Sequence, residues 1–282
     1  MLRDAQVAFL GSGVMAEAMI AGLLNQKLIA PAQIIASGPR PERGQYLHTR
    51  YGVGVTCDNV AAVNDAGIVV LSVKPQVLRG VLHEIRGHIR SRVLVLSIVA
   101  GARIQTISNG LAHAGVVRAM PNTPAQIGEG ITVWTATPEV TEEQRGQART
   151  ILSALGQEIY VEDEDDLDKA TALSGTGPAY VFLFMEAMID AGVHLGFSRR
   201  IAQQLVLQTM RGSVEYARQS TKHPAELRNQ VTSPGGTSAE ALYHLEKGGL
   251  RTVVSRAIWA AYQRSLALGQ GKKHGGPAEN EL

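Results

Sequence analysis

The stretch Val7-Ala8-Phe9-Leu10-Gly11-Ser12-Gly13-Val14-Met15-Ala16 decides the fold of the first half of the chain. Its first four residues are continuously apolar, as expected of a strand that helices cover on both faces. Gly-x-Gly-x-x-Ala follows at residues 11–16, and an amphipathic helix is predicted over 14–24. The first glycine permits a tight turn, the second lets a pyrophosphate approach the backbone, and the small third residue lets helix and strand pack closely. The stretch therefore predicts a dinucleotide-binding loop at a helix N-terminus.

The segments that follow continue the alternation of strand and helix. Strands are predicted at 33–36, 68–72, 93–97 and 116–120, and helices at 41–50, 59–66, 77–89 and 104–112. Such alternation is typical of a parallel, doubly wound sheet with right-handed crossovers. Segments 131–136 and 157–161, on either side of a helix at 141–155, are candidates for additional edge strands. The predicted fold class is α/β, with an N-terminal Rossmann-type doubly wound sheet.

The pattern changes after the acidic run at residues 162–166, which we interpret as a solvated linker with helix N-terminal charge. Every later long segment has helical spacing, at 180–191, 199–219, 224–231, 237–247 and 250–268. We predict a dinucleotide-binding domain at 1–165, a helical domain at 166–270 and a disordered tail at 271–282. Helices that are apolar on more than one face need more than one neighbour, so the helical half is predicted to be a homodimerisation domain.

Composition and charge exclude several other classes of protein. The 27 basic and 25 acidic residues give a net charge of +2, and no basic block exceeds two residues, which argues against a nucleic-acid partner. No apolar run reaches the roughly 18 residues that span a bilayer, and residues 1–4 show no signal-peptide pattern. The single cysteine, Cys57, fits a reducing compartment. The eight histidines form no ligand set at metal spacing. We expect a cytoplasmic protein with no metal site and neither nucleic acid nor membrane as a partner.

The end of the second strand bears on the choice of cofactor. NAD sites usually carry an acid there that binds the ribose 2′-hydroxyl, whereas this chain reads Ala36-Ser37-Gly38-Pro39-Arg40. A hydroxyl and a guanidinium suit a 2′-phosphate, so NADPH is the predicted cofactor and NADH the alternative. Arg40 and the nearby Arg43 have a second interpretation as solvated loop charges.

Three further loops follow predicted strands, at the sheet edge where open α/β sheets bind ligands. Ser72-Val73-Lys74-Pro75 follows one strand, and Ile98-Val99-Ala100 follows another. Asn122 lies in a turn between two prolines, where a structural role is as plausible as a contact with the nicotinamide. The cofactor-binding residues predicted from these loops, the first loop and the end of the second strand are Leu10, Gly11, Ser12, Gly13, Val14, Met15, Ser37, Arg40, Ser72, Val73, Lys74, Pro75, Ile98, Val99, Ala100 and Asn122.

Two glycine-rich segments that carry hydroxyl groups interrupt the helical half. Ser174-Gly175-Thr176-Gly177-Pro178 and Ser233-Pro234-Gly235-Gly236-Thr237-Ser238 each precede a predicted helix. Backbone N–H groups and a hydroxyl at a helix N-terminus suit a carboxylate ligand. A simple N-cap is the alternative for both, and a domain hinge is a further alternative for the first. The predicted substrate-binding residues are Ser174, Thr176, Ser233, Gly236, Thr237 and Ser238.

Taken together, these motifs resemble the pyrroline-5-carboxylate reductase family over residues 6–268. The most specific segments are Leu173–Tyr180 and Val231–Ser238, in this order and after a dinucleotide fold. The resemblance implies a Rossmann domain followed by a helical dimerisation domain, with dimers often gathered into larger rings such as decamers. It also implies hydride transfer from NAD(P)H to 1-pyrroline-5-carboxylate, which gives L-proline in the last step of proline biosynthesis.

The resemblance also assigns individual residues. It places Asn59 near the adenosine of the cofactor, and it places the substrate carboxylate and ring nitrogen at Gly236, Thr237 and Ser238. The loop residues that it places along the cofactor are Val73, Lys74, Pro75, Val99 and Ala100. The chain departs from the family at Ser238, where threonine is usual, and at Gln230, where some members carry asparagine.

Ser238 is the predicted catalytic residue. Reduction of a cyclic imine needs a hydride at carbon and a proton at nitrogen, and a hydroxyl aimed at the nitrogen can polarise it or relay a proton from water. Two other classes fit part of the sequence. A β-hydroxyacid dehydrogenase would carry a catalytic lysine on the first long interdomain helix, and segment 180–191 has none. An NADP-sensing module would have no need of the segment Ser233–Ser238.

Overall fold

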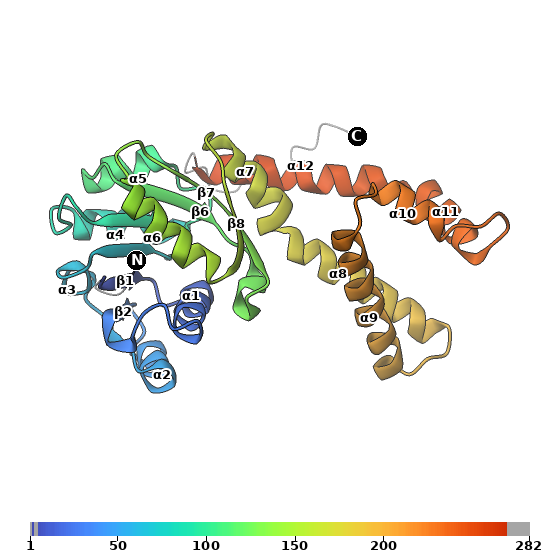
Figure 1. Ribbon diagram of the computed structural model, residues 1–282, viewed down its shortest axis with the longest axis horizontal. Coiled ribbons are helices and arrows are strands. Elements are labelled where there is room, and N and C mark those ends of the chain that lie inside the picture. The colour runs from blue at the N-terminus through green and yellow to red at the C-terminus, as the bar shows by residue number, and fades with distance from the viewer. Residues whose placement is uncertain (1, 3–4, 270–282) are drawn as a thin grey trace. The chain divides into compact units, whose positions relative to one another are not determined.

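The computed structural model describes residue 2 and residues 5–269, which form two compact units (Figure 1). Unit 1 contains the described residues up to Thr176 together with those from Ala261 onward, and unit 2 is Gly177–Ala260. The compact units therefore divide the chain later than the predicted boundary near residue 165, and that boundary stays a prediction. The predicted tail at 271–282 lies outside the described residues.

An eight-stranded sheet forms the centre of unit 1, in the order β3-β2-β1-β4-β5-β6-β7-β8. Its strands are β1 (Val7–Leu10), β2 (Ile34–Ser37), β3 (Gly54–Thr56), β4 (Ile68–Leu71), β5 (Leu94–Ser97), β6 (Val116–Met120), β7 (Gly130–Ala136) and β8 (Gly156–Tyr160). All neighbouring pairs are parallel except β6 and β7. The strands predicted up to residue 120 are parallel, as expected, and segments 131–136 and 157–161 do add strands at one edge, for which no direction was predicted. The β6–β7 pair is antiparallel because the short 3-10 turn Thr123–Ile127 that joins these two strands is not a crossover helix. The doubly wound α/β class is confirmed.

Two elements near β2 differ from the prediction. The strand β3 was not predicted, because three residues are too few to show a periodicity. Gln33, which was expected to begin the second strand, instead ends a 3-10 turn, Pro31–Gln33, that a proline starts.

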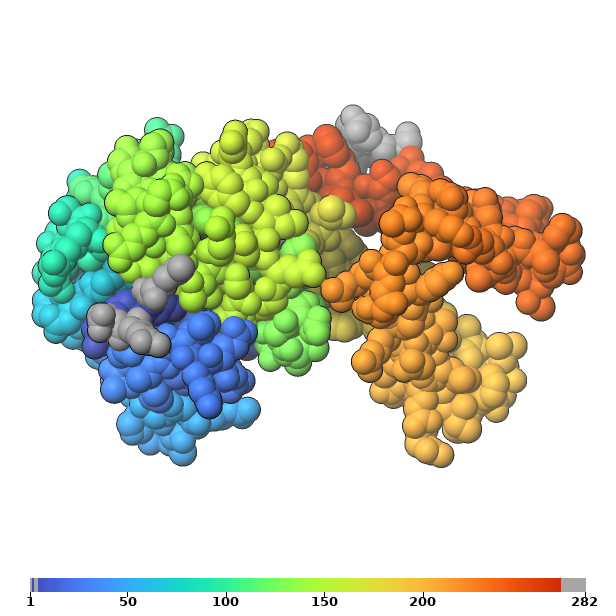
Figure 2. Space-filling view, viewed as in Figure 1, coloured from blue at the N-terminus to red at the C-terminus, as the bar shows by residue number. Residues whose placement is uncertain are grey.

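Helices cover both faces of the sheet. One group is α1 (Val14–Asn25), α2 (Pro41–Tyr51) and α6 (Glu142–Ser153), and the other is α3 (Asn59–Val63), α4 (Pro75–Ile85) and α5 (Ile104–Leu111). In the space-filling view, α1 and α6 are on the near surface of unit 1 (Figure 2). The sequence of β1 explains the two layers, because successive side chains of a strand point to opposite faces.

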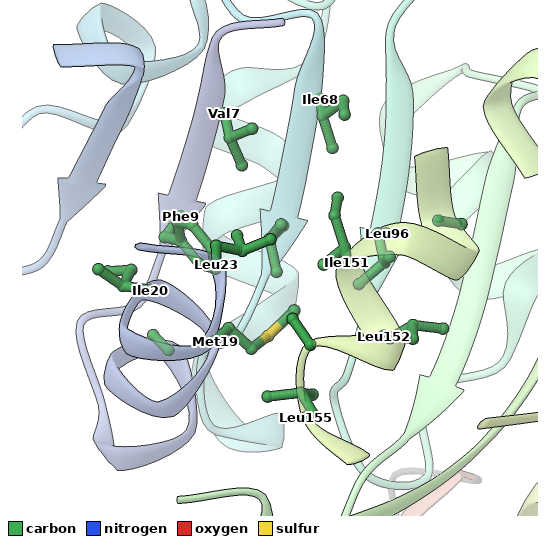
Figure 3. Close-up of a cluster of buried hydrophobic side chains, with 14 of the residues drawn as sticks. Val7, Phe9, Met19, Ile20, Leu23, Ile68, Leu96, Ile151, Leu152 and Leu155 are labelled. Carbon is green, nitrogen blue, oxygen red and sulfur yellow. The ribbon is translucent and has the colours of Figure 1, made fainter. Parts of the chain in front are cut away.

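Alternate residues of β1 belong to two separate hydrophobic clusters. Val7 and Phe9 pack with Met19 of α1 and Ile151 of α6, and all four are fully buried (Figure 3). Their neighbours Ala8 and Leu10 belong to the cluster on the opposite face. The continuous apolar run of β1 is therefore needed to fill two cores.

The acidic run after β8 is held by cations of unit 1. The Glu164 carboxylate accepts hydrogen bonds from Arg118 Nη1 and from the Ile104 N–H, both at 2.8 Å. Asp165, the first residue of α7 (Asp165–Ala170), pairs with Arg103. The expectation of a solvated linker is therefore wrong for the part of the run that distant basic residues bind. The expected helix N-terminal charge is confirmed, because Asp165 and Asp166 lie in the first turn of α7.

A buried ionic cluster fixes the last turns of α12 (Leu250–Gly269) to unit 1. The Asp168 carboxylate, 1 % exposed, accepts from Ser265 Oγ at 2.7 Å and from Arg118 Nη2 at 3.1 Å. Its second oxygen lies 3.3 Å from Arg103 Nη2. Ser265 follows Asp168 by 97 residues, so the end of the chain's last described helix is a structural part of unit 1.

Unit 2 consists of α8 (Gly177–His194), α9 (Arg199–Gln219), α10 (Pro224–Gln230), α11 (Thr237–Lys247) and the first half of α12. Many of its large apolar side chains are exposed, for example Phe182, Leu183 and Trp259, each at 60 % or more. One helical run, Asp165–His194, is long and apolar enough to cross a membrane by length and composition alone. Only 6 % of an apolar stretch of 18 residues within it is buried. A helix that packs against a second copy of the chain has the same properties.

Candidate active site

The loop after β1 has the geometry of a phosphate cradle. Gly11 has φ +104°, a conformation that strongly favours glycine, and its N–H donates to the Ser37 carbonyl at 2.9 Å. A Cβ at Gly11 would lie 2.7 Å from the backbone carbonyl of Ser72. The Ser72 hydroxyl donates to the Gly11 carbonyl at 2.8 Å, so the ends of β1, β2 and β4 meet at this loop.

The start of α1 is open to a ligand. Gly13 is the N-cap and provides no capping side chain, and no atom of the described residues lies within 4 Å of the place where its Cβ would be. The N–H groups of the first helical turn have no acceptor within the helix, and the positive end of the helix dipole lies there. These residues therefore fit the pyrophosphate of a dinucleotide.

Arg43 braces this loop from α2. Its Nε donates to the Ser12 carbonyl at 2.7 Å, and its Nη2 forms a 2.5 Å ion pair with Glu17 of α1. Burial acts to raise the pKa of Glu17, but hydrogen bonds from Arg43, Tyr51 and Tyr46 outweigh it and hold that pKa below its ordinary value. The carboxylate thus stays ionised and offsets the charge of Arg43.

Ser37 and Arg40 differ in how they can meet a 2′-phosphate. Arg40 is exposed, and its guanidinium forms no hydrogen bond or ion pair within the described part of the chain. Ser37 is fully buried, and its hydroxyl donates to Asn59 Oδ1 at 2.7 Å. The predicted contact of Ser37 with the cofactor stays a prediction, and the geometry favours an indirect role through Asn59.

The loops after β4 and β5 lie side by side at the same edge of the sheet. The Ile98 N–H donates to the Leu71 carbonyl at 3.0 Å. Lys74 is the N-cap of α4 and is exposed, and Pro75 is the first helical residue. The Val99 side chain is buried, so a cofactor contact there would come from the backbone.

The Asn122 amide has protein partners at both ends. Its oxygen accepts from the Ile131 N–H at 3.0 Å, and its nitrogen donates to the Ser174 carbonyl at 3.2 Å. The geometry therefore favours the structural interpretation of this residue, and its contact with the nicotinamide stays a prediction.

The segment containing Ser174 and Thr176 is helical. Thr171–Gly175 forms a π-helical turn between α7 and α8, and the Thr176 N–H already donates to the Thr171 carbonyl at 2.8 Å. The Ser174 hydroxyl donates to the carbonyl of Ala170, the last residue of α7, and the Thr176 hydroxyl donates to the Thr171 carbonyl. The expectation of a free helix N-terminus at this segment is wrong, because the helical hydrogen bonds continue through it. The substrate roles of Ser174 and Thr176 stay predictions without that support.

The second segment, Ser233–Ser238, does precede a helix. The Gly236 N–H donates to the Ser233 carbonyl at 3.0 Å across a turn with Pro234 and Gly235 at its centre. Gly235 has φ +71°, as the third position of a type II turn requires. Gly236 is the N-cap of α11 and provides no side-chain cap. The simple N-cap interpretation is therefore wrong for this segment, and the first-turn N–H groups remain for a ligand.

Hydroxyl groups surround this open helix start. Ser238 is the second residue of α11 and is half-buried, while Ser233 and Thr237 are exposed. These residues belong to unit 2, whereas all the predicted cofactor residues belong to unit 1.

Known families match both parts of the chain. The family described as pyrroline-5-carboxylate reductase dimerisation matches residues 164–268, and the family described as NADP oxidoreductase coenzyme F420-dependent matches residues 6–101. A pyrroline-5-carboxylate reductase of Synechocystis is 44 % identical over 94 % of this chain and 98 % of its own length. One from Pseudomonas aeruginosa is 41 % identical over 94 % of this chain and 97 % of its own length. The chain belongs to the pyrroline-5-carboxylate reductase family.

Solved structures of the family have the same fold. The pyrroline carboxylate reductase of Plasmodium falciparum, with NADP bound, has a TM-score of 0.87 at 33 % identity and covers 94 % of this chain and 98 % of its own. The enzyme of Coxiella burnetii has a TM-score of 0.85 at 35 % identity and covers 94 % of this chain and 98 % of its own. The predictions of an NADP-dependent oxidoreductase with a Rossmann domain and a helical dimerisation domain are therefore confirmed.

Sequence reasoning did not find the acidic residues that bind Arg43 and Asn59 near the cofactor loop, nor the one that binds Arg118 in the ionic cluster at the end of α12. Glu17, Glu84 and Asp168 bind Arg43, Asn59 and Arg118 respectively. These partners lie 26, 25 and 50 residues apart along the chain, so no local pattern announces them.

Proposed function

We propose that this chain reduces 1-pyrroline-5-carboxylate to L-proline with NADPH, and with NADH as an alternative, in the last step of proline biosynthesis. The observation that carries the proposal is the uncapped start of α11 at Gly236, with the Ser238 hydroxyl beside it. A member of this family with a dinucleotide loop needs a second site that binds a small carboxylate, and this helix start has the required donors.

The substrate carboxylate would bind at the N-terminus of α11. The N–H groups of Thr237, Ser238 and Ala239 lie in the first helical turn and have no acceptor in the helix. The helix dipole adds a favourable interaction with a negative charge. Gly235 and Gly236 carry no side chains, so the carboxylate can approach the backbone closely.

Ser238 would act on the imine nitrogen. Bound NADPH supplies the hydride that the imine carbon receives. The nitrogen is basic, so a hydroxyl suffices to polarise it or to relay a proton from water. Orientation of the bound ring supplies much of the rate, since well-oriented reactants gain roughly 7–11 kcal/mol in favourable cases.

The cofactor would extend along the sheet edge of unit 1. Its pyrophosphate would lie on the loop at Gly11–Met15 and its 2′-phosphate near Arg40. The loops at Ser72–Pro75 and Ile98–Ala100 would line the remainder. The open space at Gly13 supports this placement, as does the Arg40 guanidinium, which has no partner among the residues that the structure describes.

The chain forms homo-oligomers through its dimerisation domain. We further propose that the dimer uses the exposed apolar side chains of unit 2 and that dimers assemble into a decamer. The nearly balanced charge and the single cysteine support a cytoplasmic enzyme that has neither membrane nor nucleic acid as a partner.

A direct assay of NADPH oxidation and of the product tests this function. The full chain, mixed with NADPH and pyrroline-5-carboxylate, is expected to oxidise NADPH and release L-proline, which mass spectrometry identifies. Gly11→Ala should abolish the activity and NADPH binding because its Cβ meets the Ser72 carbonyl at 2.7 Å, whereas Gly80→Ala, with nothing within 4 Å, should change neither. Oxidation no faster than in a protein-free control would refute the proposed function.

A further inference from the structure

A carboxylate is coupled to the strand end where Rossmann folds bind the adenosine ribose. Ser37 is the last residue of β2 and pairs with Leu10 of β1, directly before the phosphate loop. Its hydroxyl contacts Asn59, and the Asn59 amide nitrogen donates to Glu84 Oε2 at 2.8 Å. Glu84 belongs to α4, so the sequence around β2 gives no sign of this acid.

The donors and acceptors in the hydrogen-bond series Ser37–Asn59–Glu84 can be assigned from their chemistry. An ionised carboxylate only accepts hydrogen bonds, so Asn59 must turn Nδ2 towards Glu84 and Oδ1 towards Ser37. Ser37 must then donate to Asn59, which uses the only proton of its hydroxyl. Ser37 consequently has no proton left for a phosphate oxygen, whereas it can still accept a hydrogen bond.

The charges around this strand end nearly cancel. Arg43 is paired with Glu17. Arg40 contributes a cation that has no partner in the described residues, and Glu84 contributes an anion that has no cationic partner there. A 2′-phosphate carries close to two negative charges, so its electrostatic attraction to this site is weaker than the presence of two arginines suggests. A neutral ribose diol loses no binding energy through the negative charge of Glu84.

We propose that Glu84 is a specificity-determining residue, which weakens NADPH binding relative to NADH and so keeps both cofactors usable. This inference rests on the proposed function, since it concerns the cofactor site of the same reaction. Glu84 acts in two ways. Its charge opposes the 2′-phosphate, and its hydrogen bond fixes Asn59 so that Ser37 cannot donate to that phosphate.

Glu84→Gln separates the charge from the hydrogen bond. The glutamine oxygen can still accept from Asn59, so the contact is kept and the negative charge is removed. The test measures the Kd of the full chain for NADPH and for NADH without substrate, from the fluorescence of the reduced nicotinamide. We expect the Kd for NADPH to fall by about threefold to tenfold and that for NADH to change by less than about twofold. The gain should shrink at high salt because exposed charges are screened.

Glu143→Gln is the matched control, because it removes an exposed carboxylate from α6. It should leave the ratio of the two Kd values unchanged. Glu84→Ala, which also removes the hydrogen bond to Asn59, should raise the preference for NADPH at least as much as Glu84→Gln.

An unchanged ratio of the Kd values in both Glu84 variants, or a ratio shifted towards NADH, would overturn the inference. If the wild-type chain reduces the substrate but the Glu84 variants leave the ratio of the two Kd values unchanged, the proposed function stands and only the role of Glu84 is refuted. If the wild-type chain binds neither nucleotide, both fall together.

Discussion

In the proposed reaction a single hydroxyl, that of Ser238, would act on the imine nitrogen. Ser238 is half-buried at the start of α11, and the family resemblance leads us to expect threonine at this position. The β-methyl of threonine restricts the side-chain rotamer, so in this chain the neighbours must orient the serine hydroxyl.

Loss of that hydroxyl should slow the reaction without weakening the binding of the cofactor. We expect Ser238→Ala to lower kcat by about 100-fold, within the range for a single group that assists proton transfer. The Kd for NADPH should stay the same, because Ser238 contacts substrate rather than cofactor in the proposed site. Ser238→Thr serves as the control and should retain kcat. Steady-state kinetics that give an unchanged kcat for Ser238→Ala would remove the residue from the mechanism.

The Glu17–Arg43 pair should stabilise the protein only above acidic pH. The pKa of Glu17 in the folded chain lies below its ordinary value of 4.5, so protons bind the unfolded chain more readily. The stability that Glu17 contributes is therefore fully present above that value and is lost as the pH falls through the lower folded pKa.

Thermal unfolding of Glu17→Gln alongside the wild type measures this contribution. The variant should have a lower Tm at pH 7, and the difference should diminish as the pH is lowered below about 4.5. A Tm difference that stays constant across the acidic range would show that the ionised pair is not its cause.

At the scale of elements, one buried arginine joins strand, helix and chain end. Arg118 of β6 contacts Glu164 and Asp168, and Asp168 also accepts from Ser265 of α12. Both Arg118 and Asp168 are 2 % exposed or less. Removal of Arg118 leaves the buried Asp168 carboxylate with one cation, Arg103 at 3.3 Å, in place of two. Removing one partner of a buried ion pair costs far more than replacing both partners.

Arg118→Met should therefore lower the free energy of unfolding by about 3–5 kcal/mol. The double variant Arg118→Met/Asp168→Leu should recover part of this loss, because it also removes the buried carboxylate that has lost one of its two cations. Arg218→Met, which breaks an exposed pair with Glu215 at 3.3 Å, is the control and should cost less than about 1 kcal/mol. Urea unfolding at fixed protein concentration gives all three values, and an equal cost for both single variants would contradict the buried-pair argument.

The predictability of the elements depended on their length. β1 and the long helices of unit 2 were identifiable because their apolar spacing extends over several residues or turns. The three-residue strand β3 was too short for that signal. The antiparallel step from β6 to β7 and the π-helical turn at Thr171–Gly175 escaped prediction because both depend on how segments pack, not on the order of apolar residues.

At the scale of the whole molecule, the apolar surface of unit 2 is the feature that a single chain does not explain. Phe182 and Leu183 of α8 are 60 % and 67 % exposed, and Trp259 of α12 is 63 % exposed. Exposed apolar area of this kind marks an interaction surface, and the dimerisation family supplies the partner as a second copy.

Charge placed on that surface should separate the subunits. Phe182→Glu buries a carboxylate without a partner in any interface that covers α8, so the oligomer should dissociate at micromolar concentration. Sedimentation velocity measures the change. Ser91→Glu, on an exposed loop of unit 1, is the control and should leave the sedimentation coefficient unchanged. An intact oligomer of Phe182→Glu would place the interface elsewhere.

Sequence alone determined the features that depend on neighbouring residues: the phosphate loop at Gly11–Met15, the alternating strands and helices, and the glycine-rich start of α11. Each of these follows from local backbone preference and from periodicity, so contiguous residues suffice to predict it. Only the tertiary structure decided which side chains remain free to act. In the folded chain Arg43 pairs with Glu17, and Asn59 donates a hydrogen bond to Glu84. The Ser174 hydroxyl is taken up by a hydrogen bond within a continuous helix. Contacts between residues 25 or more positions apart are set by the packing of whole elements, which no local pattern encodes.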